Sequence, residues 1–217
     1  MISKRDFLTG SAALAALPGT ALAEDLNLSI FTDLGPFYPV RKPAEVDADL
    51  TRLAGHKSRA KGKVIEVTGR VLNLRGEPAK GAKLEVWQAN AAGKYDHPGD
   101  TSDLPLDPDF QGYASFVAGA DGRYSFLTIE PADYPAATFI RAAHIHFDVT
   151  GSGSRLVTQL YLPNTEARLA NDPIFQKDLA PYPPEAKSRV FGKRRAGASK
   201  AEAGADVYDY DIILISG

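Results

Sequence analysis

Seven short apolar segments, each bounded by turn residues, constrain the fold of this chain more than any other feature. They are rich in β-branched and aromatic residues and span 63–74, 82–89, 112–117, 123–129, 144–150, 155–162 and 207–215. Segments of this length between Gly, Pro, Asn and Asp clusters are typical of β-strands. Their succession, without a Rossmann or phosphate-loop glycine pattern, predicts an all-β fold, a β-sandwich with long connecting loops.

The connections between these segments carry their own predictions. Arg75-Gly76-Glu77-Pro78 lies between the first two segments and predicts a hairpin-like connection. Residues 33–39 contain two prolines and a glycine, which exclude a helix and predict an ordered loop. Residues 164–200 are polar, so we expect a long excursion there, with at most a short helix near 172–179.

The absence of cysteine limits the chemistry of this chain. Its 217 residues, 44% of them hydrophobic, suit one domain with its own core. Without thiolates, any metal must be held by His, Asp, Glu or Tyr, which favours a hard ion. A net charge of −2 does not indicate nucleic acid or an anionic membrane as a partner. The oligomeric state stays open, a homo-oligomer included.

The first 23 residues have the pattern of an export signal. The basic pair Lys4-Arg5 precedes a weakly apolar run over 7–17, and a small-x-small pattern ends at Ala23. The run is too short to predict a membrane span. Residues 3–8 resemble a twin-arginine signal with Lys in place of the first Arg, so the twin-arginine and Sec routes both stay open. We expect a signal peptide over 1–23, a periplasmic protein and a domain over 24–217; an amphipathic first helix is the alternative.

Two of the four histidines lie in the segment 144–150. Because side chains alternate between the faces of a strand, His144 and His146 are expected on the same face, with Ile145 on the other. Two imidazoles placed in this way can reach a single ion. Two hydrogen-bonded histidines at a strand surface are the alternative interpretation.

Two tyrosines lie in polar loops directly after strand segments. Tyr95 follows the segment 82–89, and Tyr134 follows the segment 123–129. Loops on a rigid scaffold often carry the working groups of an enzyme. For either tyrosine alone, a packed loop side chain with a hydrogen-bonded hydroxyl is the ordinary interpretation.

Several motifs taken together are more specific. They are Gly35-Pro36-Phe37-Tyr38-Pro39, Gly93-Lys94-Tyr95-Asp96-His97, Pro131-Ala132-Asp133-Tyr134-Pro135, Arg141-Ala142-Ala143-His144-Ile145-His146-Phe147, Thr158-Gln159-Leu160-Tyr161-Leu162 and the final segment from Tyr210 to Ile215. In order and local context this set resembles the intradiol ring-cleavage dioxygenases, most of all the protocatechuate 3,4-dioxygenase branch. The resemblance covers nearly the whole chain after the predicted signal.

The resemblance implies a mononuclear non-haem Fe(III) held by Tyr95, Tyr134, His144 and His146. It also implies an ortho-dihydroxy aromatic substrate, whose ring is cleaved with O2 between the two oxygen-bearing carbons to give a muconate-type diacid. Tyr134 would leave the metal and accept a substrate proton, which is general base catalysis. Arg141 would stabilise charge developing on the ring, and Gln159 matches a family residue near the substrate. Asp96 and His97 are expected outside the ligand set.

Three points stay open at this stage. Arg141 would face away from His144 on a regular strand, so the role implied for it requires a bend at Ala142-Ala143; a surface salt bridge is its alternative. The segment 135–140 is shorter than in protocatechuate enzymes and lacks their tryptophan, so a carboxylated catechol cannot be assumed. The predicted export leaves two alternatives open: the natural substrate is an extracytoplasmic aromatic, or the activity has been reduced. The rival functions are a prealbumin-like binding module and a His-x-His copper or zinc protein.

Overall fold

The structure is a computed structural model that describes residues 27–216, so the predicted signal over 1–23 lies outside the described residues. The described chain is mostly β. Its strands are β1 (Val64–Asn73), β2 (Lys83–Gln88), β3 (Tyr113–Val117), β4 (Arg123–Ile129), β5 (Tyr134–Ala136), β6 (Phe139–Arg141), β7 (His144–Thr150), β8 (Arg155–Tyr161), β9 (Lys193–Arg194), β10 (Asp206–Asp209) and β11 (Ile212–Leu214). All seven predicted segments contain strand, but the last, 207–215, forms two strands, β10 and β11, and not one.

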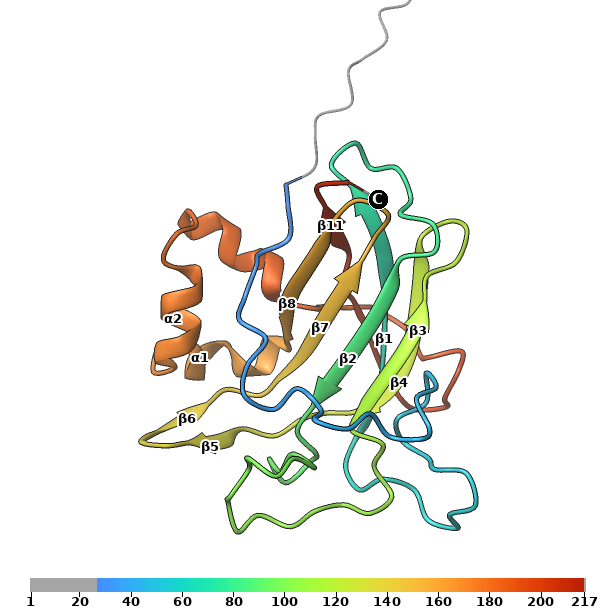
Figure 1. Ribbon diagram of the computed structural model, residues 1–217, viewed down its shortest axis with the longest axis vertical. Helices are drawn as coiled ribbons and strands as arrows, with labels where there is room; N and C mark the ends of the chain where they lie inside the picture. Colours follow the sequence, from blue (N-terminus) through green and yellow to red (C-terminus); the bar gives the residue numbers. More distant parts are fainter. Residues whose placement is uncertain (1–26, 217) are drawn as a thin grey trace, which may run out of the picture.

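Two sheets pack face to face around the main core (Figure 1). One sheet is antiparallel, in the order β3-β2-β7-β8; in the other, β1 pairs with β4 on one side and with β10 and β11 on the other. Apolar side chains from both sheets meet between them, for example Val67 of β1, Leu84 of β2 and Phe147 of β7. The predicted all-β sandwich is confirmed, and β5 and β6 form a separate two-stranded hairpin beside it.

The connection between the first two strands was predicted to be hairpin-like, and this prediction is wrong. After the turn, Pro78 forms only an isolated bridge with Leu72, and Ala79 donates its N–H to the carbonyl of Val71. The chain then crosses at Gly81, which has φ +74°, so that β2 belongs to the opposite sheet. Burial of Ala79 and Ala82 in the core favours this crossing over continued pairing with β1.

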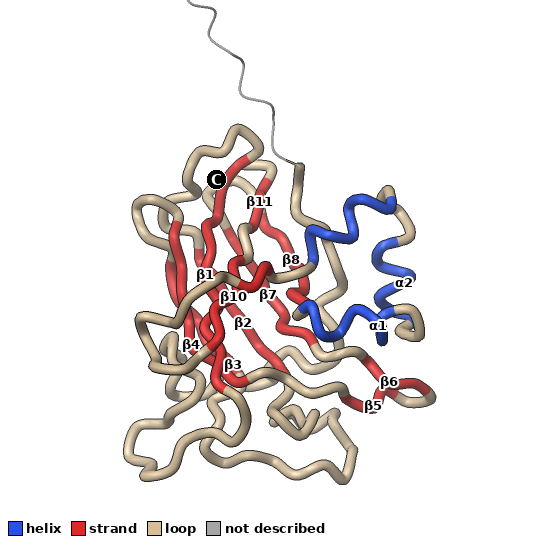
Figure 2. Tube along the Cα trace, turned by 180° about the vertical axis from the view of Figure 1, so that it is seen from behind, coloured by secondary structure: helices blue, strands red, loops and turns tan. Residues whose placement is uncertain are grey.

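The excursion after β8 is more helical than predicted. It contains the 3-10 turn η1 (Pro163–Thr165), α1 (Glu166–Leu169), α2 (Pro173–Leu179) and the 3-10 helix η2 (Pro184–Val190). Only α2 was expected. These elements pack as a second layer beside β8 around their own apolar cluster, as the views from both sides show (Figures 1 and 2).

Residues 33–39 form neither helix nor strand, and the segment continues across the outer face of β2. Glu85 of β2 is buried there and accepts hydrogen bonds from the Tyr38 hydroxyl at 2.6 Å, Lys42 at 2.6 Å and Lys83 at 2.5 Å. Burial alone would raise the pKa of Glu85, but these three donors outweigh it and lower the pKa to about 2. The carboxylate therefore holds the N-terminal segment against the sheet.

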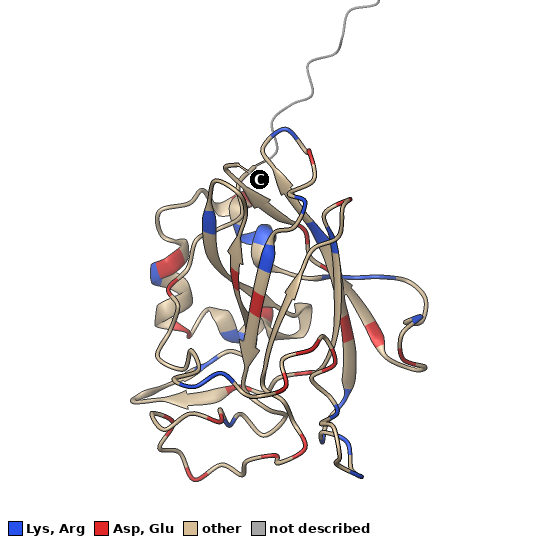
Figure 3. Cartoon of the chain, turned by 45° about the vertical axis from the view of Figure 1, so that its right-hand side comes forward, with Lys and Arg blue, Asp and Glu red and all other residues tan. Residues whose placement is uncertain are grey.

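Charged residues are distributed without a basic face in the view of Figure 3, where blue and red segments alternate along the strands and loops. This agrees with the near-neutral net charge of −2. Among residues 27–216, no helix has the length and apolar character needed to cross a membrane.

Candidate metal centre and its cavity

The two histidines lie on β7, where strand alternation places both on one face, as predicted. Both are buried, and their Nε2 atoms lie 3.0 Å apart. The Nδ1 atom of His144 lies 2.6 Å from the carbonyl oxygen of Ala142, which favours the tautomer with the proton on Nδ1 and the lone pair on Nε2. Two nitrogens bound at about 2.1 Å to one ion, at a right angle, lie about 3 Å apart. The pair therefore has the spacing of neighbouring ligands.

The two predicted tyrosines complete the group. Tyr95 comes from the loop after β2, where its backbone N–H donates to Asp100 at 2.8 Å, and Tyr134 begins β5. Their ring centroids are 5.1 Å apart. The rings of Tyr134 and His144 are 5.7 Å apart, and those of Tyr95 and His146 are 6.4 Å apart. Four side chains that span 52 positions of sequence thus surround one point in space.

The chemistry of this set suits a hard, highly charged cation. The Tyr95 hydroxyl is buried without a hydrogen-bond partner of acceptable geometry among the described residues, and such an unsatisfied group costs about 1–3 kcal/mol. A cation at the centre would satisfy it. The described residues contain no cluster of three or more His, Cys, Asp or Glu that could hold a metal, so a site here depends on the tyrosines.

Burial controls the charge of these four groups in the metal-free chain. It lowers the pKa of His146 to about 3, with the Arg141 charge adding to the effect, and lowers that of His144 well below its ordinary value. It raises the pKa of Tyr95 and of Tyr134, although Arg141 opposes the rise at Tyr134. The histidines are therefore neutral and ready to ligate, while the phenols need a bound cation to lose their protons.

Arg141 lies next to the four candidate ligands because the strand is interrupted at Ala142-Ala143, where the role implied for Arg141 required a bend. β6 ends at Arg141 and β7 begins at His144, with Ala142 and Ala143 outside both strands. The guanidinium lies 3.3 Å from the Nε2 atom of His144 and donates to Gln159 Oε1 at 2.9 Å. Both predicted residues, Arg141 and Gln159, are thus buried beside the candidate ligands, and the surface salt bridge is excluded for Arg141.

Asp172 is a residue of this site that sequence reasoning missed. It is the N-cap of α2 and accepts from the backbone N–H groups of Ile174 and Phe175. The same carboxylate accepts from Arg141 Nη1 at 2.8 Å and from the Ala142 N–H at 3.1 Å. The side chains of Arg141 and Asp172 are only 3% and 0% exposed. Aspartate followed by proline at a helix start is a capping signal that could have identified Asp172 as the N-cap, but nothing in the sequence linked it to Arg141.

Packing holds the ring of His146 in place. Trp87 of β2 stacks on it with centroids 4.7 Å apart and an interplanar angle of 5°. A side chain at Gly35, which has φ +77°, would place its Cβ 3.1 Å from His146 Cε1. Nδ1 of His146 has no hydrogen-bond partner among the described residues. The orientation of this imidazole therefore depends on the contacts with Trp87 and Gly35.

A cavity of about 620 Å³ opens beside the candidate centre. It lies between the loop at 33–37, residues 99–102, the β5–β6 hairpin and α2. Tyr134, Arg141, His146 and Gln159 line it, whereas Tyr95 and His144 lie behind them. His97, partly exposed and in contact with Phe37, does not line it.

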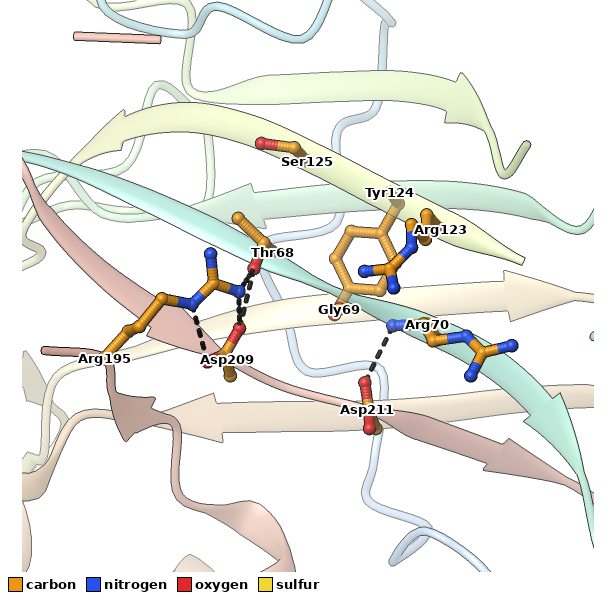
Figure 4. A pocket seen from close by; sticks show the side chains of 9 residues that line it. All are labelled: Thr68, Gly69, Arg70, Arg123, Tyr124, Ser125, Arg195, Asp209 and Asp211. Carbon is orange, nitrogen blue, oxygen red and sulfur yellow. Dashed lines mark hydrogen bonds and ion pairs between the residues drawn. The ribbon is translucent and has the colours of Figure 1, made fainter. Parts of the chain in front are cut away.

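A second cavity of about 610 Å³ lies on the other sheet, against β1, β4 and β10 (Figure 4). None of the predicted site residues lines it. Arg195 donates there to Asp209 and, at 2.9 Å, to the Thr68 hydroxyl, and the backbone N–H of Arg70 donates to Asp211 at 2.8 Å. Its polar side chains pair with one another or with neighbours such as Asp121 and Glu66, so the cavity at the four rings is the better candidate for chemistry.

Comparison with known proteins agrees with this assignment. The family model described as Dioxygenase matches residues 34–216. The protocatechuate 3,4-dioxygenase beta chain of Burkholderia cepacia is 42% identical over 184 residues, covering 82% of this chain and 76% of that protein. A hydroxyquinol 1,2-dioxygenase of Rhizobium sp. (strain MTP-10005) is 33% identical over 159 residues, covering 66% of this chain and 50% of that longer protein.

Solved structures show the same fold. The dioxygenase domain of a carbohydrate-binding fusion protein from Streptomyces sp. SirexAA-E has a TM-score of 0.64 at 24% identity and covers 88% of this chain and 100% of that one. Catechol 1,2-dioxygenase of Acinetobacter radioresistens has a TM-score of 0.65 at 21% identity, covering 90% of this chain and 65% of that one. Family model, sequence identity and fold agree, and the chain belongs to the intradiol ring-cleavage dioxygenase family.

Proposed function

We propose that this protein is an Fe(III)-dependent intradiol dioxygenase that cleaves the ring of a catechol-class substrate with O2. The observation that carries the proposal is the convergence of two phenol and two imidazole rings, with the hydroxyl of Tyr95 buried and without a hydrogen-bond partner of acceptable geometry among the described residues. Tyr95, Tyr134, His144 and His146 are the proposed ligands. Two relatives are named as dioxygenases of protocatechuate and of hydroxyquinol, which supports an ortho-dihydroxy aromatic as the substrate class.

Ferric iron held by Tyr95, Tyr134, His144 and His146 would supply a Lewis acid that favours loss of the catechol protons, and the deprotonated diol would be electron-rich enough to react with O2. Tyr134 is a proposed ligand that also lines the cavity, so its phenolate would be placed to take a proton from the substrate. Arg141 and Gln159 line the same wall, and the Arg141 cation is placed to stabilise negative charge that develops on the ring. Leu34, Phe37 and Trp87 pack against the tyrosines and exclude water from the ligand side.

The rival functions account for less of this arrangement. A binding module needs no converging donor set. A His-x-His copper or zinc site explains His144 and His146 but leaves the buried hydroxyl of Tyr95 without a hydrogen-bond partner among residues 27–216. Two phenolates and two imidazoles instead match a hard ferric ion.

The test is spectroscopic and uses the protein loaded with ferric iron. Tyrosinate bound to ferric iron absorbs visible light, so we expect a red-brown protein that bleaches under an anaerobic reductant. Tyr95→Phe should shift and weaken the band, whereas Tyr182→Phe, a conservative change in the helical layer, should leave it unchanged. A colourless protein that takes up one zinc ion and no iron would reject the proposal. Oxygen uptake with catechol should yield a muconate-type diacid and no coloured semialdehyde.

Export is a separate proposal that depends on residues 1–23. It is supported by the basic pair, the apolar run and the small-x-small pattern before position 24. Expression of the full chain in a bacterial host, followed by N-terminal sequencing of the periplasmic fraction, tests it. We expect the mature protein to begin at Glu24; an intact N-terminus in the cytoplasm contradicts the prediction.

A further inference from the structure

We infer that the cavity selects catechols without a ring carboxylate and that it has room for a small apolar substituent on the ring. The inference rests on the proposed function and specifies its substrate class. It also departs from the substrate in the name of the 42% identical relative, since protocatechuate carries a carboxylate. Three features of the cavity support it: its lining, the pairing of its cations and the pairing of its carboxylates.

The walls of the cavity away from the candidate ligands are largely apolar. Their apolar part is formed by Pro36, Phe37, Pro135, Ala136, Ala137, Phe139 and Ile174, and residues 99–102 add a polar edge. These residues come from the N-terminal loop, the β5–β6 hairpin and α2, so the apolar wall surrounds a ring that faces the metal. With about 620 Å³ in total, the cavity has space beyond an unsubstituted catechol. Each methylene buried against such a wall improves binding by roughly three- to fourfold.

Both cations that line the cavity are already paired. The Arg141 guanidinium forms an ion pair with Asp172 at 2.8 Å, and this pair is almost completely buried. Lys177 of α2 forms an ion pair with Asp33 at 3.3 Å, and its side chain is 74% exposed, which places it at the mouth. A ring carboxylate would therefore have to displace an existing partner to gain a counter-charge.

The carboxylates of the cavity are paired as well. Asp33 pairs with Lys177 at 3.3 Å, and Asp100 pairs with Lys94 at 3.1 Å. Asp178 of α2 does not line the cavity, but it interacts electrostatically with Asp33, and its Oδ2 is buried without a hydrogen-bond partner among the described residues. A substrate carboxylate would therefore meet cations that are already neutralised, whereas a neutral substituent would not be opposed.

The experiment compares four catechols on the iron-loaded protein: catechol, 4-methylcatechol, 4-ethylcatechol and protocatechuate. We expect kcat/KM for catechol to exceed that for protocatechuate at least about tenfold, because an unpaired carboxylate pays its desolvation cost. The alkylcatechols should bind more tightly than catechol in anaerobic calorimetry, a readout that does not depend on turnover. Protocatechuate cleaved as fast as catechol or faster would overturn the inference and leave the proposed function intact. Failure to cleave any of the four would overturn both.

Two variants test the charge argument directly. Asp33→Asn releases Lys177, so protocatechuate should gain roughly two- to fivefold in kcat/KM relative to catechol, the range for an exposed ion pair. Asp121→Asn makes the same change in net charge at the β3–β4 turn, far from the cavity lining, and should leave the ratio of the two substrates unaltered. If the ratio of kcat/KM for protocatechuate to that for catechol is the same in wild type and Asp33→Asn, the selection is not set by the pairing of Lys177. A gain in this ratio that Asp121→Asn shares would contradict it in the same way.

Discussion

Replacing Asp172 tests whether the helical layer holds Arg141 in position. Asp172 combines two functions in one carboxylate, because it caps α2 and pairs with Arg141. Asparagine caps a helix as well as aspartate does, and its amide oxygen can still accept one hydrogen bond from Arg141. Alanine can do neither. The pair of variants Asp172→Asn and Asp172→Ala therefore separates the charge from the cap.

The expected magnitudes follow from burial. For Asp172→Asn we expect the free energy of unfolding to fall by about 3 kcal/mol, the lower end of the cost of leaving a buried charge unpaired, because the amide oxygen can still accept one hydrogen bond from Arg141. For Asp172→Ala we expect a fall of about 4–6 kcal/mol, because breaking a buried ion pair costs 3–5 kcal/mol and losing an N-cap about 1 kcal/mol more. The double variant Arg141→Met with Asp172→Asn should lose less free energy of unfolding than the sum of the two single variants. The reason is that the double variant leaves no buried charge unpaired.

Urea unfolding of the metal-free variants measures these differences, and the same variants loaded with iron supply the kinetics. If Asp172 acts through Arg141, Asp172→Asn lowers kcat in the wild-type background and has no further effect on Arg141→Met. A loss of under 0.5 kcal/mol in Asp172→Asn would show that the ion pair contributes nothing, and an additive loss of kcat would refute positioning through Arg141. Asp133→Asn, which removes a carboxylate that accepts from the Ala143 N–H, is the matched control.

Three further changes have defined outcomes. Gly35→Ala should cost about 1–2 kcal/mol for its left-handed φ of +77° and should also weaken iron retention by displacing His146; equal iron affinity in wild type and variant would contradict this. Ala137→Gly relieves a non-glycine φ of 53° at the tip of the β5–β6 hairpin, so thermal unfolding should show a gain of about 0.5 kcal/mol after the entropy of glycine is subtracted; a loss would mean that the turn is unstrained. Because the folded pKa of Glu85 is about 2 and its ordinary value is 4.5, its contribution is complete above pH 4.5 and is lost as the pH falls through 2. By linkage, the contribution of ionised Glu85 to the free energy of unfolding is at most about 3 kcal/mol. Solvent screening reduces it, because the paired lysines are exposed. Glu85→Gln should remove this part of the acid dependence of unfolding.

Local pattern was sufficient wherever neighbouring residues decide the outcome. The alternation of a strand placed His144 and His146 on one face without any knowledge of the sheet. Turn residues separated the strands, and a short helix was expected near 172–179, where α2 lies. The family motifs predicted the four candidate ligands as well as Arg141 and Gln159, and the structure brings these residues together.

Tertiary structure decided everything that depends on distant partners. β1 and β2 are consecutive, yet they lie in different sheets, because pairing is chosen by the burial of both faces and not by the turn between them. Trp87 meets His146 only because β2 pairs with β7 in that register. Asp172 reaches Arg141 across 31 positions of sequence. The residue types that can bind a metal are thus determined by the sequence, whereas the partners that hold them, and the charges that face a substrate, follow from packing between segments that carry no local signal of one another.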